Sequence, residues 1–240
     1  MISTKNFLEY SLFTKKLGDF PSQSKILINT INQYSYCIAQ EDSEFKRALQ
    51  ASDVLLPDGI GVVIGAKFLT GENIKKIAGA DVHHYLLNDL NKKNGSCFYL
   101  GSSDETLKKI TERIKIEYPN VNIHSYSPPF KQAFSDDDNK AIADEINMYK
   151  PDVLFVGMTA PKQEKWVFSN KNQLDAGIIC TIGAVFDFYA ETVKRPSEFW
   201  ISLGLEWLVR LVKEPSRMWK RYLYYGPIYI HYLLNRKFTT

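Results

Sequence analysis

The chain has 240 residues, of which 45% are hydrophobic and 24% charged, and this balance is ordinary for a folded globular protein. Charges interrupt the first 20 residues and no stretch approaches the roughly 20 apolar residues that span a bilayer, so neither a signal peptide nor a membrane-spanning helix is expected. The three cysteines, Cys37, Cys97 and Cys180, are widely spaced, which excludes a disulfide framework or zinc motif and favours a reducing cytoplasmic compartment.

The formal net charge of +3 is unevenly distributed along the chain. From Lys194 onward there are 9 Lys/Arg against 3 Asp/Glu, whereas residues 1–193 hold 21 Lys/Arg against 24 Asp/Glu. A tail of net +6 on a body of net −3 predicts an anionic partner for the tail.

The body alternates short apolar runs with amphipathic helical patterns. In chain order the pattern predicts a strand over 24–31, a helix over 35–51, a strand over 53–56, helices over 61–69 and 80–91, a strand over 97–100, a helix over 103–117, an extended segment over 121–126, a helix over 135–149, a strand over 153–156, a helix from about 161 and a strand over 177–182. Strands that alternate with helices indicate an α/β fold with a mainly parallel sheet and helices on both faces. Such sheets bind ligands at the carboxyl ends of their strands.

The segment from Glu198 to Phe238 is helical in period, rich in aromatic and basic residues, and has no strand pattern. We therefore predict a core over 1–195 and a helical appendage over 196–240. On one continuous helix, a basic stripe would be formed by Arg210, Lys213, Arg217 and either Lys220 or Arg221. This stripe fits a solvated face, a helix packed on its own domain, a nucleic-acid patch or a membrane-surface helix. The density of Trp and Tyr favours the membrane interface, and no nucleic-acid partner is expected.

Three predicted strands end in polar residues, namely at Asn29–Asn32, Pro57–Gly59 and Gly157–Glu164. A helix that begins directly after a strand offers its N-terminus to a phosphate or another anion. Each segment also has a purely structural interpretation, because Asp-Gly is common in turns and Asn or Thr side chains cap helices. Their expected convergence at one edge of the sheet favours a functional site.

The acidic run Asp136–Asp138 could hold a divalent metal, as DxD elements do in many sugar-nucleotide transferases. It follows Ser135 at the start of a helical pattern, where acidic residues stabilise the helix dipole. We therefore predict no metal site. The four histidines, His83, His84, His124 and His231, form no catalytic or metal-binding pattern and are expected in the core or on the surface.

Short motifs follow one another in a specific order from about Ile26 to Tyr222. They are Asn29-Thr30-x-Asn32, Asp58-Gly59 with Val62-Val63, Ala78-Gly79-Ala80-Asp81, Ala160-Pro161-Lys162-Gln163-Glu164, Gly183 to Phe188, Lys194-Arg195-Pro196, Gly204-Leu205-Glu206-Trp207 and Glu214-Pro215-Ser216-Arg217. A single motif would be weak, but the ordered series is highly specific. With it the chain resembles the WecG/TagA/CpsF family of glycosyltransferases.

The resemblance implies an inverting transferase with a Rossmann-like core that uses UDP-N-acetylmannosamine or a related UDP-sugar, and no cofactor is expected. The implied acceptor is N-acetylglucosamine on undecaprenyl diphosphate, for teichoic acid, enterobacterial common antigen or capsule synthesis. By motif match Asp58 corresponds to the general base, and Thr30 and Asn32 to its neighbours in the pocket. Gln163 and Asp187 match residues of the donor pocket.

The leaving UDP would gain negative charge, and without a metal cationic side chains must stabilise it. The candidates are Arg210, Arg217 and Arg221 in the appendage, with Lys76 and Lys194 nearer the body. Lys76 stands where relatives often have Arg. The same arginines could instead hold the diphosphate of the acceptor. The expected location is the cytoplasmic face of the plasma membrane, with peripheral attachment.

Two rivals stay open. One is a family member that transfers another hexose or a uronic sugar, and the other is a non-catalytic scaffold for polysaccharide assembly. A dinucleotide-dependent dehydrogenase is disfavoured, because no GxGxxG follows a predicted strand.

Overall fold

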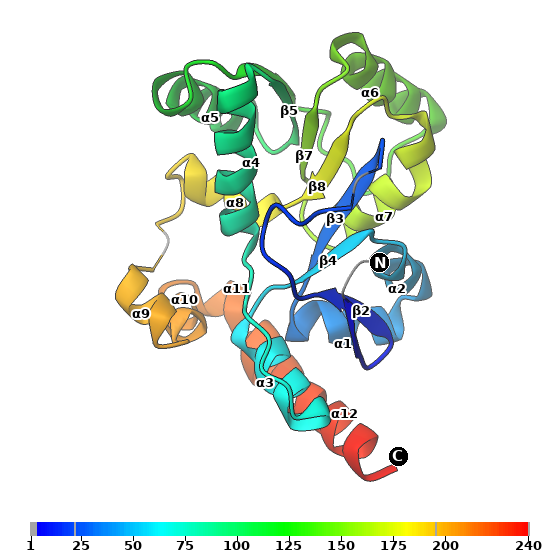
Figure 1. Ribbon diagram of the computed structural model, residues 1–240, viewed down its shortest axis with the longest axis vertical. Helices are drawn as coiled ribbons and strands as arrows, with labels where there is room; N and C mark the ends of the chain where they lie inside the picture. Colours follow the sequence, from blue (N-terminus) through cyan, green and yellow to red (C-terminus); the bar gives the residue numbers. More distant parts are fainter. Residues whose placement is uncertain (1–3, 22, 195, 240) are drawn as a thin grey trace.

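The computed structural model describes residues 4–21, 23–194 and 196–239. Its centre is an eight-stranded sheet with the order β1-β2-β4-β3-β8-β7-β5-β6 (Figure 1). The strands are β1 (Thr4–Phe7), β2 (Tyr10–Phe13), β3 (Ile26–Ile31), β4 (Val54–Pro57), β5 (Ser96–Gly101), β6 (Asn122–Tyr126), β7 (Val153–Gly157) and β8 (Ile178–Thr181). Only β1 and β2 pair in antiparallel fashion in this part of the chain, so the predicted mainly parallel α/β sheet is confirmed.

Helices cover both faces of the sheet, as predicted. They are α1 (Gln33–Glu41), α2 (Ser43–Gln50), α3 (Ile60–Thr70), α4 (Gly79–Lys93), α5 (Asp104–Glu117), α6 (Asp136–Tyr149), α7 (Lys162–Asn170), α8 (Gly183–Tyr189), α9 (Glu198–Ser202), α10 (Glu206–Lys213), α11 (Pro215–Trp219) and α12 (Tyr225–Thr239), with a 3₁₀ turn η1 (Lys171–Gln173) and a π-helical segment η2 (Lys220–Tyr224).

The core lies in three apolar clusters, because strands buried on both faces carry apolar side chains at nearly every position. Helices α4, α5 and α8 pack on one face of the sheet. Helices α6 and α7 cover the β5, β7 and β8 region of the other face. Next to them, α1, α2, α3 and α12 pack around β1, β2 and the neighbouring strands β3 and β4.

The expected single helix over 35–51 is two helices that meet at Asp42. The Asp42 carboxylate accepts hydrogen bonds from the backbone N–H groups of Glu44 and Phe45, at 3.1 and 2.9 Å, and so caps α2. The hairpin of β1 and β2 was not predicted, because polar residues interrupt both strands and leave no continuous apolar run.

The described part of the C-terminal segment consists of helices joined by short turns, as predicted. The single basic stripe is wrong, however, because α10 ends at Lys213 and α11 begins at Pro215. Helix α12 packs against α1 and α3, and the pair α3 and α12 extends side by side away from the sheet (Figure 1). Of the helices described, none combines the length and apolar character that crossing a membrane requires.

Candidate active site

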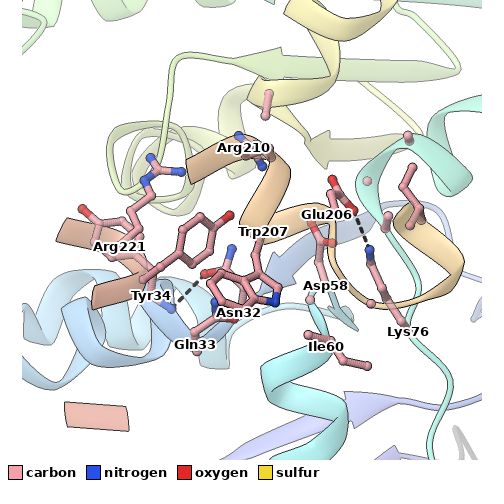
Figure 2. A pocket seen from close by; sticks show the side chains of 18 of the residues that line it. Asn32, Gln33, Tyr34, Asp58, Ile60, Lys76, Glu206, Trp207, Arg210 and Arg221 are labelled. Atoms are coloured by element: carbon pink, nitrogen blue, oxygen red, sulfur yellow. Dashed lines mark hydrogen bonds and ion pairs between the residues drawn. The ribbon is translucent and has the colours of Figure 1, made fainter. Parts of the chain in front are cut away.

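A pocket of about 380 Å³ opens at the carboxyl ends of β3 and β4, where the C-terminal helices face the sheet (Figure 2). The core contributes Asn32, Asp58 and Lys76, and the starts of α4 and α8 contribute Gly79 and Ala184. The C-terminal helices contribute the rest of the wall, including Leu203, Glu206, Trp207, Arg210, Arg221 and Tyr222. From β3 the chain moves to β4 on one side, and its next strand, β5, lies on the other side of β3, so the order of the strands reverses near these strand ends. Open α/β sheets bind ligands at such a point.

Asp58 reaches the pocket because it follows the last residue of β4 and precedes a turn into α3. Its backbone N–H donates to the carbonyl of Ile31 at 2.9 Å, which ties the ends of β3 and β4 together. Gly59 has φ +114°, a conformation that L side chains rarely adopt, and a Cβ there would lie 3.3 Å from the Cβ of Asn32. The Asp-Gly pair thus provides both the carboxylate and the turn that exposes it.

The pKa of Asp58 is raised from 3.8 to about 6, mainly because burial disfavours the charged carboxylate. Nearby charges act in both directions. Glu206 and Asp81 raise this pKa, whereas Lys76 and Arg210 lower it. A carboxyl group with a pKa just below neutrality suits a general base, since it is ionised at pH 7 and still accepts a proton readily.

Lys76 and Glu206 form an ion pair across the pocket, with Nζ and Oε2 2.8 Å apart (Figure 2). The two residues are 130 positions apart in sequence, and their side chains are 25% and 19% exposed. The pair therefore joins the loop before α4 to the start of α10. It also places a cation and an anion beside Asp58.

Asn32 has a clear structural role within the pocket. Its Oδ1 accepts hydrogen bonds from the N–H groups of Tyr34 and Ser35, both at 3.0 Å, and Ser35 Oγ accepts from the N–H of Asn32 at 2.8 Å. This capping box begins α1 at the end of β3. Asn32 lines the pocket, and its side-chain Oδ1 is already engaged in the cap.

Two guanidinium groups from the C-terminal helices face the same pocket (Figure 2). Arg210 lies over the ring of Phe188, 5.3 Å from its centre, and among the described residues its buried Nε has no hydrogen-bond partner. Arg221 lies over the ring of Tyr34 at 4.7 Å, and burial lowers its pKa. Stacked guanidinium groups with donors to spare are suited to binding a diphosphate.

The remaining predicted site residues, Thr30, Gln163, Asp187 and Arg217, are not part of the pocket wall. Thr30 lies on β3 beside Leu56 of β4. Arg217 donates to Glu214 at 2.9 Å, and both charges influence the half-buried Asp187, whose pKa burial raises. Their roles therefore stay predictions.

Gln163 is 4% exposed and lies in the first turn of α7. Its Oε1 accepts from the N–H of Met158 at 3.2 Å, and its Nε2 donates to Glu164 at 2.9 Å. A Cβ at Gly183 would lie only 2.5 Å from the same Oε1, so this glycine lets the start of α8 approach Gln163.

Glu206, Trp207 and Tyr34 line the pocket although no role was predicted for them. Glu206 and Trp207 belong to a motif quoted above, so the sequence contained a signal for them. Tyr34 follows the Asn32 cap in the first turn of α1, and its position under Arg221 depends on tertiary packing.

Within the described ranges, no group of three or more His, Cys, Asp or Glu residues is placed to hold a metal ion. The run Asp136–Asp138 begins α6, as predicted. Ser135 Oγ accepts from the N–H of Asp138 at 3.2 Å, and the Asp138 carboxylate accepts from the N–H of Ser135 at 2.9 Å. Lys131 also binds this carboxylate, at 2.8 Å.

Known proteins are similar to this chain along most of its length. The family model described as "Glycosyl transferase WecG/TagA/CpsF family" matches residues 8–240. An N-acetylglucosaminyldiphosphoundecaprenol N-acetyl-beta-D-mannosaminyltransferase of Bacillus subtilis (strain 168) is 33% identical over 91% of this chain and 80% of the relative. Proteins of the same description are 31% identical in Bacillus spizizenii (77% of this chain, 70% of the relative) and 24% identical in Staphylococcus aureus (strain MW2; 83% and 75%).

The α/β sheet has, at its carboxyl edge, cationic groups and a carboxylate that can act as a base. Together with these relatives, this arrangement defines a sugar-transferring enzyme. The chain belongs to the WecG/TagA/CpsF family of glycosyltransferases.

Proposed function

We propose that the protein transfers N-acetylmannosamine, or a closely related sugar, from a UDP donor to N-acetylglucosaminyl-diphospho-undecaprenol. The product would serve the synthesis of teichoic acid or another cell-surface polysaccharide. The acceptor and the transferred sugar are those named for the relatives. The UDP donor and inversion at the anomeric carbon come from the family resemblance.

The observation that carries the proposal is the position of Asp58, a carboxylate with a raised pKa that faces Arg210 and Arg221 across one pocket. The donor and the acceptor both contain a diphosphate. A site for their reaction therefore needs guanidinium or ammonium groups beside a base, and this pocket contains both.

In the proposed reaction, a hydroxyl of the acceptor sugar attacks the anomeric carbon of the donor sugar while Asp58 accepts the hydroxyl proton. The bond between that carbon and the diphosphate oxygen breaks, and UDP leaves with the bonding electrons. A single displacement inverts the configuration at the anomeric carbon. A positioned base contributes a factor of about 10²–10⁴ to such a step.

Charge develops on the diphosphate as UDP leaves, and preorganised cations stabilise it. Arg210 and Arg221 are our candidates for this role. Lys76 would exchange its contact with Glu206 for a phosphate oxygen. Thr30, Gln163, Asp187 and Arg217 are proposed to complete the site when substrates bind.

We further propose that residues 196–240 act as an appendage that completes the pocket at the membrane surface. Its net charge of +6 favours anionic headgroups. The appendage provides Glu206, Trp207, Arg210 and Arg221 to the pocket wall, so the position of these helices determines whether the site is complete.

The deciding experiment measures UDP release from a panel of UDP-sugars with a short-chain polyprenyl-diphosphate N-acetylglucosamine acceptor. We expect turnover with one N-acetylhexosamine donor and a loss of at least about 100-fold in Asp58→Asn. Asp144→Asn, an exposed change on α6, is the matched control and should keep wild-type turnover.

Wild-type turnover by Asp58→Asn would contradict the assigned base. Turnover with a hexose or uronic donor alone would replace the sugar assignment. Folded protein without turnover on any donor would contradict the proposed reaction.

A further inference from the structure

Helix α3 presents an apolar stripe to solvent. Ile60, Ile64 and Phe68 are 36%, 58% and 40% exposed, and their spacing of four residues places them along one side of the helix. Exposed apolar residues are common singly, whereas contiguous exposed apolar patches are typical of binding surfaces.

The stripe is not the side of α3 that packs against the rest of the protein. Val62, Gly65 and Ala66 are buried, and a Cβ at Gly65 would lie 2.6 Å from Tyr229 Oη and 3.1 Å from Leu233 Cδ2 of α12. Helix α3 is thus apolar on its packed side and, apart from Lys67 and Thr70, on its solvent side. A surface helix normally carries polar residues on its solvent side.

The stripe is continuous with the proposed active site. Ile60 lines the pocket two residues after Asp58, and it is labelled beside that carboxylate in Figure 2. Leu203, which is 55% exposed, also lines the pocket, and a Cβ at Gly204 would lie 3.5 Å from Ile60 Cγ1. An apolar mouth therefore leads from the charged pocket onto α3.

From Ile60 to Phe68 the stripe extends about 12 Å along the helix axis. It runs toward the end of the α3 and α12 pair that lies farthest from the sheet (Figure 1). There Lys237 of α12 lies over the ring of Phe68, 5.7 Å from its centre. An elongated apolar ligand that enters at the pocket would follow this line.

We propose that the exposed side of α3 binds the first isoprene units of the acceptor's polyprenyl chain as the chain leaves the pocket. The inference rests on the proposed function, in which the acceptor joins a diphosphate to such a chain. The charged groups of the pocket suit the diphosphate, and Ile60, Ile64 and Phe68 form an apolar line that begins at the pocket wall and continues along α3.

The test compares two acceptors with the same sugar-diphosphate head group, one with a long polyprenyl chain in detergent micelles and one with a short, water-soluble chain. The variant Ile64→Ser/Phe68→Ser should lower kcat/KM for the long-chain acceptor by about tenfold or more. It should leave kcat/KM for the short-chain acceptor unchanged. Ile116→Ser, an 81% exposed position on α5 far from α3 (Figure 1), is the control and should affect neither acceptor.

A second measurement does not depend on turnover. Titration calorimetry with long-chain polyprenyl diphosphate in micelles should show binding to the wild type that Ile64→Ser/Phe68→Ser weakens by a similar factor. If the wild type turned over neither acceptor but showed this binding, the proposed reaction would fail and the chain-binding surface would stand.

Three results would overturn the inference. Equal losses on both acceptors would mean that the stripe only supports the pocket. No loss on the long-chain acceptor would mean that the chain leaves elsewhere. A matching loss of binding to acceptor-free phospholipid vesicles would mean that the stripe contacts the bilayer and not the acceptor chain.

Discussion

Asp58 is surrounded by charges from both parts of the chain. Lys76 and Asp81 belong to the core, whereas Glu206 and Arg210 come from α10. The pKa of the carboxyl group is therefore set jointly by its burial and by helices that lie about 150 residues further along the chain. Any change in how α10 sits over the pocket changes the strength of the base.

We predict a pH profile of kcat/KM that rises through about pH 6 and is flat at higher pH, because Asp58 must be ionised to accept a proton. In Glu206→Gln, the loss of one negative charge and the release of Lys76 both lower the pKa of Asp58. The rise should then move to lower pH. In Lys76→Gln it should move to higher pH. Profiles with the same midpoint in all three proteins would show that this carboxyl group is not the one that titrates.

Glu164 is a second buried carboxyl group, 2% exposed, and within the described residues its Oε2 has no hydrogen-bond partner. Burial raises its pKa from 4.5 to about 7. A raised pKa means that the folded state binds the proton more tightly than the unfolded state. The contribution of this carboxyl group to the unfolding free energy is fully present below about pH 4.5 and is lost as the pH rises through 7.

We therefore expect Glu164 to lower the unfolding free energy of the wild type by about 2 kcal/mol between pH 5 and pH 8. Glu164→Gln should lack this part of the decrease. Urea unfolding at the two pH values measures this difference. Glu112→Gln, at an exposed position on α5, should retain the wild-type pH dependence. Parallel pH dependence in Glu164→Gln and the wild type would argue that Glu164 is ionised throughout.

At the scale of single elements, α3 and α12 pack closely against each other. Gly65 permits it, because its missing side chain leaves room for Tyr229 and Leu233. Tyr229 Oη also donates to the carbonyl of Gly61 at 3.3 Å. The last long helix of the described chain is thereby held against the helix that follows Asp58.

Gly65→Ala should destabilise this contact by about 1–3 kcal/mol, because the added methyl group overlaps Tyr229. Gly226→Ala on α12 is the matched control. A Cβ there meets nothing within 4 Å, and alanine favours a helix over glycine by about 1 kcal/mol. Thermal melts and limited proteolysis of α12 should separate the two variants. Equal stability of both would contradict the tight packing.

Pro227 shows how an element can differ from its local sequence signal. A proline clashes with the carbonyl four residues earlier, here that of Leu223, and usually breaks a helix. The chain instead remains helical, because η2 (Lys220–Tyr224) widens to π-helical geometry just before α12. Arg221 lies within this widened turn, above Tyr34.

Much of the fold follows from local patterns. The parallel strands, their order along the chain and the Asp58-Gly59 turn could all be predicted, because burial on both faces gives apolar runs and a strand end needs a turn. The ion pair of Lys76 and Glu206 could not, because it joins residues 130 positions apart that no period relates. The same holds for the break between α10 and α11, which divides the expected basic stripe.

At the scale of the whole molecule, the negative body and positive C-terminal segment should govern attraction to surfaces. We expect binding to anionic phospholipid vesicles and weaker binding to neutral ones, and binding should fall as salt rises from about 0.05 to 0.5 M, since the Debye length shortens. Vesicle sedimentation measures both effects. Equal binding to neutral and anionic vesicles would show that charge does not direct attachment.

Removal of residues 197–240 should abolish transfer to the lipid-linked acceptor, because the pocket would lose Arg210 and Arg221. The truncation would also uncover Tyr36, Val62 and Ala66, which α12 covers. Turnover and thermal stability should therefore be measured together. Full activity in the truncated protein would contradict the proposed appendage.

The cluster that α12 completes also contains Phe7 and Tyr10 of the first two strands, so one apolar core joins the earliest and the latest described elements of the chain. During synthesis on the ribosome, this face stays open until residues 225–239 emerge, long after the sheet has been translated. A nascent chain would thus offer a chaperone-binding surface while still lacking Arg210 and Arg221 in its pocket. Under the roles proposed for Arg210 and Arg221, transfer would begin only when translation has passed these helices.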